Sequence, residues 1–317
     1  MIISFPQFFA RILNSYHIIM KNKIAFVIAT KDRPDDLFRV LESLSLQYRK
    51  PDQVIIVSSG QRPPKEIWDR HSLLSITAVH TGLPSAARQR NIGVKKADIS
   101  MDLIGFLDDD VVLEKNALEE MMFFWKDAGE TVGGVSFNQI NHPRIFASFL
   151  KDLPLTEKIG LYSREKGRVL VSGFQTLLEH VEKSFYSDWL PSTAVVWRRE
   201  IFKEHWFDEW FGGYSYLEDL DFSYRVGKKY RLAVAAEARY HHFPSVRQRV
   251  NDYLFGKKEV ENRMHFVRKN QEFSLFRCYG ALFIRMFLTL FHFIKEHKLG
   301  YIQRLAGNFI GLAKSFL

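Results

Sequence analysis

The chain has 317 residues, a net charge of +9 and one cysteine, and these values exclude several classes of protein. A single cysteine cannot form an intramolecular disulfide framework or a cysteine-based zinc site, and it suits a reducing compartment. Residues 247–317 hold 13 of the 45 Lys and Arg but 5 of the 36 Asp and Glu, so the preceding part is nearly neutral. We therefore expect no nucleic-acid binding. The basic end indicates an anionic lipid, an anionic acceptor or a partner protein.

The first 22 residues form an apolar, aromatic leader in which Arg11 is the one formal charge before Lys21. The leader lacks the positive first region and the small-residue cleavage site of a signal peptide. An interfacial helix, a leader packed on the body and a disordered segment all stay open.

Apolar, β-branched runs alternate with amphipathic segments in the next part of the chain. Buried strands are predicted over residues 23–30, 53–57, 75–80 and from 104 onward, and helices over 34–48, 86–97 and 116–125. Pro34 suits the first turn of a helix because its missing N–H has no partner there. This alternation predicts an α/β fold with a Rossmann-like, mostly parallel central sheet flanked by helices. Ligands of such sheets bind outside the carboxyl ends of the strands.

The pattern is less regular in residues 133–246, which we assign to the same domain, residues 23–246. Strands are predicted over 133–138, 189–197 and 231–236, and helices from 198 and from about 218 to 229. Residues 141–188 show no clear period and are expected to shape the choice of acceptor.

The remaining residues, 247–317, are predicted to form a basic, amphipathic helical extension. Its most apolar stretch, residues 273–294, carries Arg277, Arg285 and His292 on one side. A central arginine in a short apolar run would cost about 2.5–3.5 kcal/mol inside a bilayer, so a helix lying in the membrane interface is favoured over a span. The alternative is a helix packed on the body or on a second copy of the chain, and in the second case the protein would be a homo-oligomer.

Three clusters in the sequence carry side chains suited to chemistry. They are Asp108-Asp109-Asp110 after a predicted strand, Glu218-Asp219-Leu220-Asp221 at a helix start, and His241-His242 at a strand end. Adjacent carboxylates repel one another, and a divalent cation such as Mn²⁺ or Mg²⁺ offsets this cost. A carboxylate away from the metal could serve as a general base on a hydroxyl. Each cluster alone also fits a solvated turn or a helix cap.

Taken in order, these clusters resemble the family 2 glycosyltransferases of the GT-A fold. The resemblance covers residues 23–245, where A-T-K-D-R, A-R-Q-R-N-I-G, F-L-D-D-D, F-D-E-W-F-G-G-Y-S-Y-L-E-D-L-D-F and Y-H-H-F-P-S follow one another. It implies an inverting, metal-dependent enzyme with a DXD motif. Such an enzyme moves a hexose-type sugar from a nucleoside-diphosphate sugar to a hydroxyl of a polysaccharide or lipid-linked glycan.

The resemblance also implies roles for individual residues. Asp219 is implied as the catalytic base, with Glu218 shaping the acceptor side. Metal ligands are implied at Asp110, with Asp108 on the metal or the ribose, and at one of His241 and His242, with His241 favoured. Nucleotide-sugar contacts are implied at Thr30, Asp32, Arg33, Ser58, Ser59, Arg90, Asn91, Asp108 and Asp109.

The sequence departs from many relatives at the end of the second strand, where Ser58 and Ser59 replace an aspartate. This leaves uridine and thymidine diphosphate sugars both open. A cytoplasmic enzyme held on the inner face of the cell membrane by its basic extension would suit a lipid-linked acceptor. The rival interpretations are a nucleotidyltransferase, against which the missing glycine-rich phosphate loop speaks, and a non-catalytic protein that binds a membrane surface.

Overall fold

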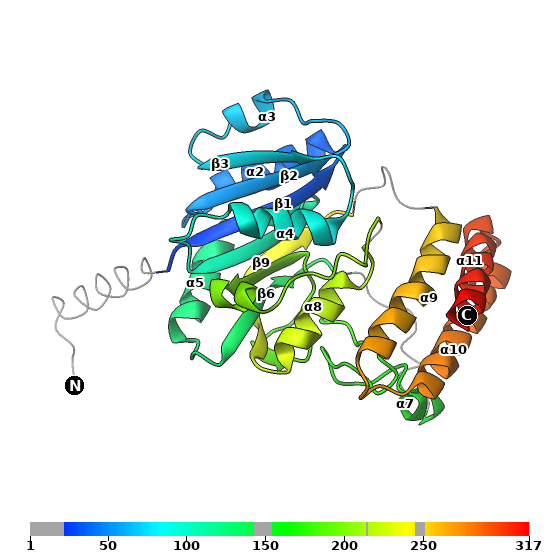
Figure 1. Ribbon diagram of the computed structural model, residues 1–317. Coiled ribbons are helices and arrows are strands. Elements are labelled where there is room, and N and C mark those ends of the chain that lie inside the picture. Colours follow the sequence, from blue (N-terminus) through cyan, green and yellow to red (C-terminus); the bar gives the residue numbers. More distant parts are fainter. Residues whose placement is uncertain (1–21, 143–153, 214, 245–250, 317) are drawn as a thin grey trace, which may run out of the picture.

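The computed structural model describes residues 22–142, 154–213, 215–244 and 251–316, and it contains one large mixed sheet (Figure 1). Along the sheet the strand order is β3-β2-β1-β4-β8-β6-β9-β5, and β7 pairs with β9. The strands are β1 (Ile24–Lys31), β2 (Gln53–Ser59), β3 (Ile76–Thr81), β4 (Leu103–Asp108), β5 (Val111–Leu113), β6 (Val132–Gln139), β7 (Phe185–Ser187), β8 (Ala194–Arg198) and β9 (Arg231–His242).

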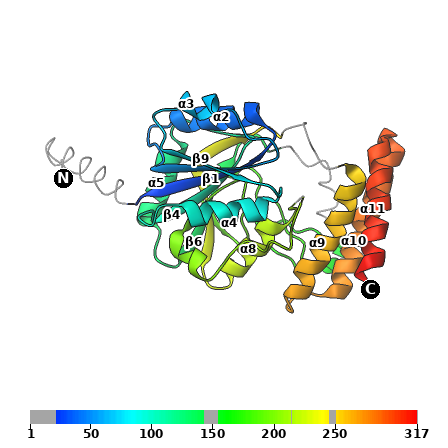
Figure 2. The same cartoon turned by 45° about the horizontal axis from the view of Figure 1, so that its top comes forward.

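Helices cover both faces of the sheet and add a separate group at the C-terminal end. They are α2 (Pro34–Ser45), α3 (Glu66–Asp69), α4 (Ala86–Lys96), α5 (Ala117–Asp127), α7 (Pro154–Ile159), the 3₁₀ helix η1 (Arg199–Lys203), α8 (Glu218–Gly227), α9 (Asp252–Lys269), α10 (Leu275–Glu296) and α11 (Leu299–Ser315). Figure 2 shows α2 and α3 on one side of the sheet and α4 and α8 on the other.

The alternation of side chains along β1 explains why both faces of the sheet are covered. Ile24, Phe26 and Ile28 belong to a core with α2 and α5, whereas Ala25 and Val27 belong to a core with α4 and α8. A strand that is apolar at every position therefore needs a layer of helices on each side. The predicted α/β fold is confirmed.

The first part of the sheet is parallel, and the second part is mixed. Strands β1 to β4 pair in parallel, β8 runs antiparallel to both β4 and β6, and β9 runs parallel to β6. The short strands β5 and β7, each of three residues, were not predicted because a run of that length carries no period. Strand β9 continues to His242, six residues beyond the predicted end at residue 236.

Most predicted elements are present, with shifted ends. The predicted strand 189–197 begins only at Ala194, and the helix predicted from residue 198 is the short 3₁₀ helix η1. The leader, residues 1–22, lies outside the described residues except for its last residue.

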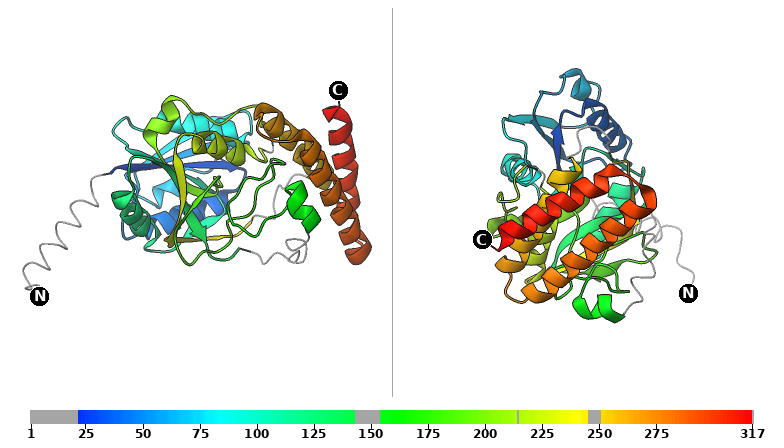
Figure 3. Two further views of the ribbon diagram at one scale, coloured as in Figure 1. Left: turned by 90° about the horizontal axis from the view of Figure 1, so that it is seen from below. Right: turned by 90° about the vertical axis from the view of Figure 1, so that its right-hand side faces the viewer.

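The extension consists of α9, α10 and α11, which pack on one another beyond the end of the sheet (Figure 3). Their shared interior holds Glu259, which is 5% exposed and receives Arg285 at 3.1 Å and Arg304 at 2.8 Å. Arg285 is thus paired with a buried carboxylate of the extension. Within the part of the chain that the structure describes, α10 is the single helix long and apolar enough to cross a membrane, judged by length and composition.

The ion pairs at Glu259 predict an acid-sensitive extension. Burial alone would raise the pKa of Glu259, but Arg285 and Arg304 lower it to about 2 from an ordinary 4.5. The stabilisation by this carboxylate is therefore complete above about pH 4.5 and is lost as the pH falls toward 2. E259Q should lose about 3–5 kcal/mol of unfolding free energy at pH 7, measured by urea denaturation, and should lack this acid dependence.

Glu237 supplies the matched control because its side chain is 62% exposed beside Arg239. E237Q is expected to change the free energy of unfolding by less than about 0.5 kcal/mol at either pH. Equal losses in the two variants would contradict the stabilising role of the buried network.

Candidate active site

The carboxyl ends of β1, β2 and β4 meet at one edge of the sheet and carry four of the predicted site residues there, Thr30, Ser58, Ser59 and Asp108. In the strand register Thr30 pairs with Ser58, and Ala29 pairs with Asp108. The antiparallel pairing of β5 with β9 brings the histidine pair to the same edge, because Val111 lies opposite His242. The first and third predicted clusters therefore meet in the fold.

The three consecutive aspartates point to three different partners. The Asp108 carboxylate accepts a hydrogen bond from Arg90 at 2.8 Å, and Asp110 lies 3.1 Å from the ring of His242. Asp109, between them, accepts from Thr30 Oγ1 at 2.7 Å. Because each carboxylate has its own partner, the chain can place three negative charges in a row.

Asp109 lies beneath the site and supports it. Its side chain is almost fully buried and also accepts from Arg33 at 3.1 Å. Burial raises the pKa of Asp109 to about 7, although Arg33 and Thr30 act in the opposite direction. These contacts favour a local role for Asp109, Thr30 and Arg33 as one hydrogen-bonded unit, and they do not support direct contact between Asp109 and a nucleotide sugar.

Arg90 joins the first acidic cluster to the second. Its guanidinium is 4% exposed, bonds Glu218 at 2.5 Å as well as Asp108 at 2.8 Å, and lies over the ring of Phe207. Burial would lower the pKa of Arg90, but the two carboxylates raise it, so the arginine stays charged. Both ends of the guanidinium are engaged by carboxylates in this geometry, and the contact of Arg90 with the nucleotide sugar stays a prediction.

Asp219 has the surroundings of a proton acceptor at the start of α8. The preceding Leu217 adopts a left-handed backbone conformation with φ 74°, which costs about 1–2 kcal/mol for a residue with a side chain. Partial burial raises the pKa of Asp219, and the nearby Asp108 adds to this effect. A partly buried carboxylate that is more basic than usual can accept a proton from a hydroxyl.

Glu218 and Asp221, on either side of Asp219, are held by cations. Burial and the charge of Asp219 raise the pKa of Glu218, while Arg90 opposes them. Asp221 is fully buried and binds Arg225 at 3.0 Å and Lys269 at 3.0 Å. Asp221 therefore holds α8 in place, and the geometry leaves Asp219 as the accessible carboxylate of the cluster.

The two histidines point to different partners, because successive side chains of a strand alternate between its faces. His242 lies 3.1 Å from Asp110, whereas His241 lies 3.5 Å from Glu114 and stacks near Phe243. His242 therefore lies nearer to Asp110 than His241 does, and the preference for His241 as a metal ligand stays a prediction. Spacing along the sequence could not reveal the alternation, because β9 was not predicted to reach the pair.

The ends of β1 and β2 are tied together by polar side chains. Asp32, at φ 53°, accepts a hydrogen bond from the backbone of Gln61 at 2.6 Å. Gly60 is required beside it, because a Cβ at this position would meet the Asp32 carboxylate at 2.3 Å. Ser58 bonds Val79 and His80 on β3, which turns its hydroxyl toward the neighbouring strand.

Two residues of α4 organise this edge through buried amides. Gln89, which the sequence reasoning missed, donates to the carbonyls of Thr30 and Val57 at 3.0 and 2.7 Å and lies 3.4 Å from Ser59. Asn91 bonds the backbone of Phe207 in both directions, at 2.9 and 3.0 Å. Asn91 therefore holds the loop before α8, and its contact with the donor stays a prediction.

Asp110 and His242 carry the kinds of ligand atom that a divalent cation binds when it also binds a substrate. A carboxylate oxygen and an imidazole nitrogen 3.1 Å apart could both turn to one Mn²⁺ or Mg²⁺ ion. Among the described residues no group of three or more His, Cys, Asp and Glu side chains forms a complete cage. The residues therefore fit an ion that completes its coordination with phosphate oxygens and water.

One family model matches the part of the chain that contains β1 to β6. Residues 25–177 match the model described as glycosyl transferase family 2. The chain matches no curated protein sequence.

Solved structures share the fold at low sequence identity. S. aureus TarS is 16% identical with a TM-score of 0.50, over 82% of this chain and 42% of that chain. S. aureus TarS 1–349 in complex with UDP is 17% identical with a TM-score of 0.51, over 77% and 65%. PcManGT from Pyrobaculum calidifontis, in complex with GDP-Man and Mn²⁺, is 13% identical with a TM-score of 0.53, over 98% and 95%. The chain thus spans less than half of the TarS chain.

The geometry of the aspartates and histidines predicts which side chains hold a divalent ion. Asp110→Ala and His242→Ala should each weaken the Mn²⁺-dependent binding of UDP by about tenfold or more, measured by calorimetry, because each removes one of two protein ligands. His241→Ala is the matched control, since its ring faces Glu114, and it should bind within about twofold of the unaltered protein. Loss of binding in H241A with retention in H242A would reverse the assignment.

Proposed function

We propose that this chain, a glycosyltransferase that carries a family 2 domain on a GT-A fold, transfers a sugar with inversion from a nucleoside diphosphate to a hydroxyl. The observation that carries the proposal is the Arg90 bridge, which holds the aspartate run and the Glu218-Asp219 pair at one edge of the sheet. In this proposal, the Arg90 bridge brings the donor site next to the base.

Asp219 is the base in this proposal. It accepts the proton of the acceptor hydroxyl while that oxygen attacks the anomeric carbon. The bond from that carbon to the diphosphate oxygen breaks on the opposite face, and the electron pair leaves with the nucleoside diphosphate. One displacement inverts the anomeric carbon and needs no nucleophilic side chain. The raised pKa of Asp219 makes it a better proton acceptor than an ordinary aspartate.

Asp110 and His242 are proposed to hold the divalent ion, with Asp108 close to the same place. When bound, the ion would neutralise the negative charge that develops on the departing diphosphate. Asp109, Thr30 and Arg33 keep the loop with these aspartates in position from below.

The donor is proposed to be a nucleoside-diphosphate sugar of the uridine or thymidine type. Ser58 and Ser59 stand where many relatives carry an aspartate, and because their hydroxyls bond β3 and Gln89 within the fold, they leave the choice of base open. The TarS complex contains UDP and the PcManGT complex contains GDP-Man, so nucleotides of both types belong in the first binding screen.

A cavity of about 180 Å³ beside the aspartates is a candidate place for the acceptor or the transferred sugar. Thr193 lines it and accepts the backbone hydrogen bond of Asp108 at 2.9 Å. Residues from β6, from the irregular region and from the segment before β8 contribute the other walls, among them Asn138, Leu177 and Trp189. The irregular region is therefore well placed to set the acceptor.

The extension is proposed to attach the enzyme to the inner face of the cell membrane, where a lipid-linked glycan would meet the site. On α10 the side chains of Phe276, Phe287 and Ile294 are 88%, 68% and 60% exposed. On α11 the side chains of Leu299 and Phe309 are 72% and 61% exposed. Such a surface costs free energy in water, and the basic residues of the extension would favour anionic lipid.

Asp219→Asn tests the base. The variant keeps the shape of the side chain but cannot take a proton, so we expect a loss of at least about 100-fold in kcat with nucleotide-sugar binding within about twofold. Product analysis by NMR should show an inverted anomeric centre in the unaltered enzyme. Asp221→Asn is no suitable control, because Asp221 is an ion-pair partner inside the fold. Near-normal turnover of D219N would refute the base assignment.

Flotation with vesicles tests the attachment. The double variant Phe283→Ser/Phe287→Ser removes two side chains that are 54% and 68% exposed on α10, and it should lower binding to vesicles containing anionic phospholipid at least about tenfold. Ile99→Ser is the matched control, because Ile99 is 85% exposed on the body of the enzyme. Equal binding of all three proteins would exclude α10 as the membrane contact.

A further inference from the structure

Helix α9 lies between α8 on one side and α10 and α11 on the other (Figures 1 and 2). Asn262, Phe266 and Lys269 follow one another at the i, i+4 and i+7 spacing that places side chains on a single helix face. Asn262 and Phe266 are fully buried. The opposite side of α9 carries α10 and α11, so α9 is the layer between these helices and the active site.

Asn262 holds the backbone directly before the catalytic carboxylates. Its amide donates to the carbonyl of Tyr216 at 2.6 Å. The next residue is Leu217, with the left-handed backbone, and its side chain packs in one cluster with Val260 and Met264 of α9. A left-handed turn at a side-chain-bearing residue persists only where its surroundings hold it. Here α9 supplies both the hydrogen bond and the packing that do so.

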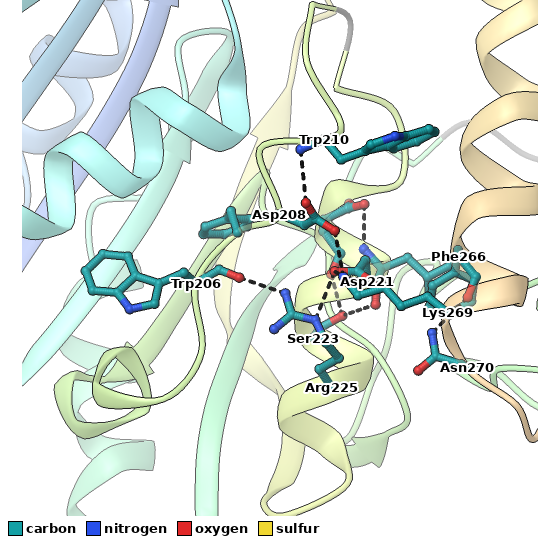
Figure 4. Close-up of polar contacts among 12 residues, drawn as sticks. Trp206, Asp208, Trp210, Asp221, Ser223, Arg225, Phe266, Lys269 and Asn270 are labelled. Carbon is teal, nitrogen blue, oxygen red and sulfur yellow. Dashed lines mark hydrogen bonds and ion pairs between the residues drawn. The ribbon is translucent and has the colours of Figure 1, made fainter.

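Lys269 and His265 hold the loop that leads to this turn. Figure 4 shows Lys269 reaching from α9 toward Asp208 and Asp221, with distances of 2.7 and 3.0 Å. His265 stacks on Trp210 at 3.7 Å and lies 3.3 Å from Asp208. Burial would raise the pKa of Asp208. Three neighbours nevertheless lower this pKa to about 2, namely Lys269, the Trp210 amide and His265, so the contact between Asp208 and Lys269 is ionic across the working pH range.

The same loop is fixed from its other side by α4. Asn91 bonds the backbone of Phe207, and a β-bridge joins Ser85 to Gly213. The loop therefore runs between α4, which belongs to the nucleotide-binding half of the fold, and α9, which belongs to the extension. The direction in which α8 begins is determined by both.

We propose that α9 is a positioning element of the active site, in which Asn262 and Lys269 fix the turn at Leu217 and hence the direction of Asp219. In this proposal the extension is an integral part of the catalytic unit and not a detachable tether. The proposal rests on the proposed role of Asp219 as the base. Neither α9 residue touches the reacting atoms.

The experiment measures release of UDP from UDP-sugars by full-length variants. Asn262→Leu keeps the volume and the burial of the side chain but removes the donor to Tyr216. We expect kcat to fall by about tenfold to a hundredfold, because a small misplacement of a catalytic group has effects of that size. The KM for the donor and the calorimetric Kd for UDP should stay within about twofold, and the acid limb of the pH profile of kcat should shift with the altered surroundings of Asp219.

Asn308→Leu is the matched control. Asn308 is also a buried asparagine of the extension, 3% exposed, and donates to the carbonyl of Gly256 at 2.8 Å between α9 and α11. Its replacement should lower the melting temperature but leave kcat and its pH profile unchanged. Should N262L fold poorly, Lys269→Met provides the same test at a side chain that is 30% exposed, with the same expected loss in kcat.

The outcomes separate the two proposals. A wild-type enzyme that releases no UDP from any sugar donor contradicts the proposed function and, with it, the role of α9. If the wild type is active, and N262L and K269M keep its kcat while their melting temperatures fall, the result contradicts the role of α9 alone. Loss of kcat in N262L, K269M and N308L to the same degree would also overturn it, since the effect would then be one of general stability.

Discussion

The active site depends on one buried cation, the guanidinium of Arg90. It lies between Asp108 and Glu218, which are 110 positions apart in the sequence, and it compensates the charge of both. Removing one partner of such a buried group leaves the other uncompensated, at a cost of about 3–5 kcal/mol. The bridge therefore sets a geometric condition, because the edge of the parallel strands and the start of α8 can assemble only around it.

This condition explains the different fates of neighbouring carboxylates. Asp108 and Glu218 are paired with Arg90, and Asp109 accepts hydrogen bonds from Thr30 and Arg33. Asp221 is paired with cations on α8 and α9. Two carboxylates are then left in positions suited to ligands. Asp110 stands beside His242, and Asp219 is half-buried near Asp108 with a raised pKa. The surroundings of Asp110, near His242 and Arg33, and of Asp219 thus distinguish these two carboxylates from their neighbours.

Much of this could be predicted from the sequence, because the signals concerned are local. A continuous apolar run such as β1 indicates a strand buried on both faces, and the end of such a strand indicates where a ligand binds. The aspartate run, the Glu218-Asp219 pair and the histidine pair could be proposed as one site from their order. The individual partners could not, since Arg90, Gln89 and Asn91 act across the fold on residues that lie far away in the chain.

The contacts of the extension also could not be predicted from its composition. Its apolar and basic composition indicated a surface for lipid, and Arg285 was the reason to favour a helix lying in the membrane interface over a span. In the fold Arg285 faces inward to Glu259, so the charges of α9, α10 and α11 hold the three helices together and the aromatic side chains are left on the outside. One helix of this group then contributes Asn262 to the turn at Leu217. The extension, whose composition indicates attachment to a membrane, is thus also hydrogen-bonded to the backbone before Asp219. The left-handed turn at Leu217 is buried beneath α9, and Asn262 supplies the hydrogen bond that the neighbouring Tyr216 carbonyl needs there.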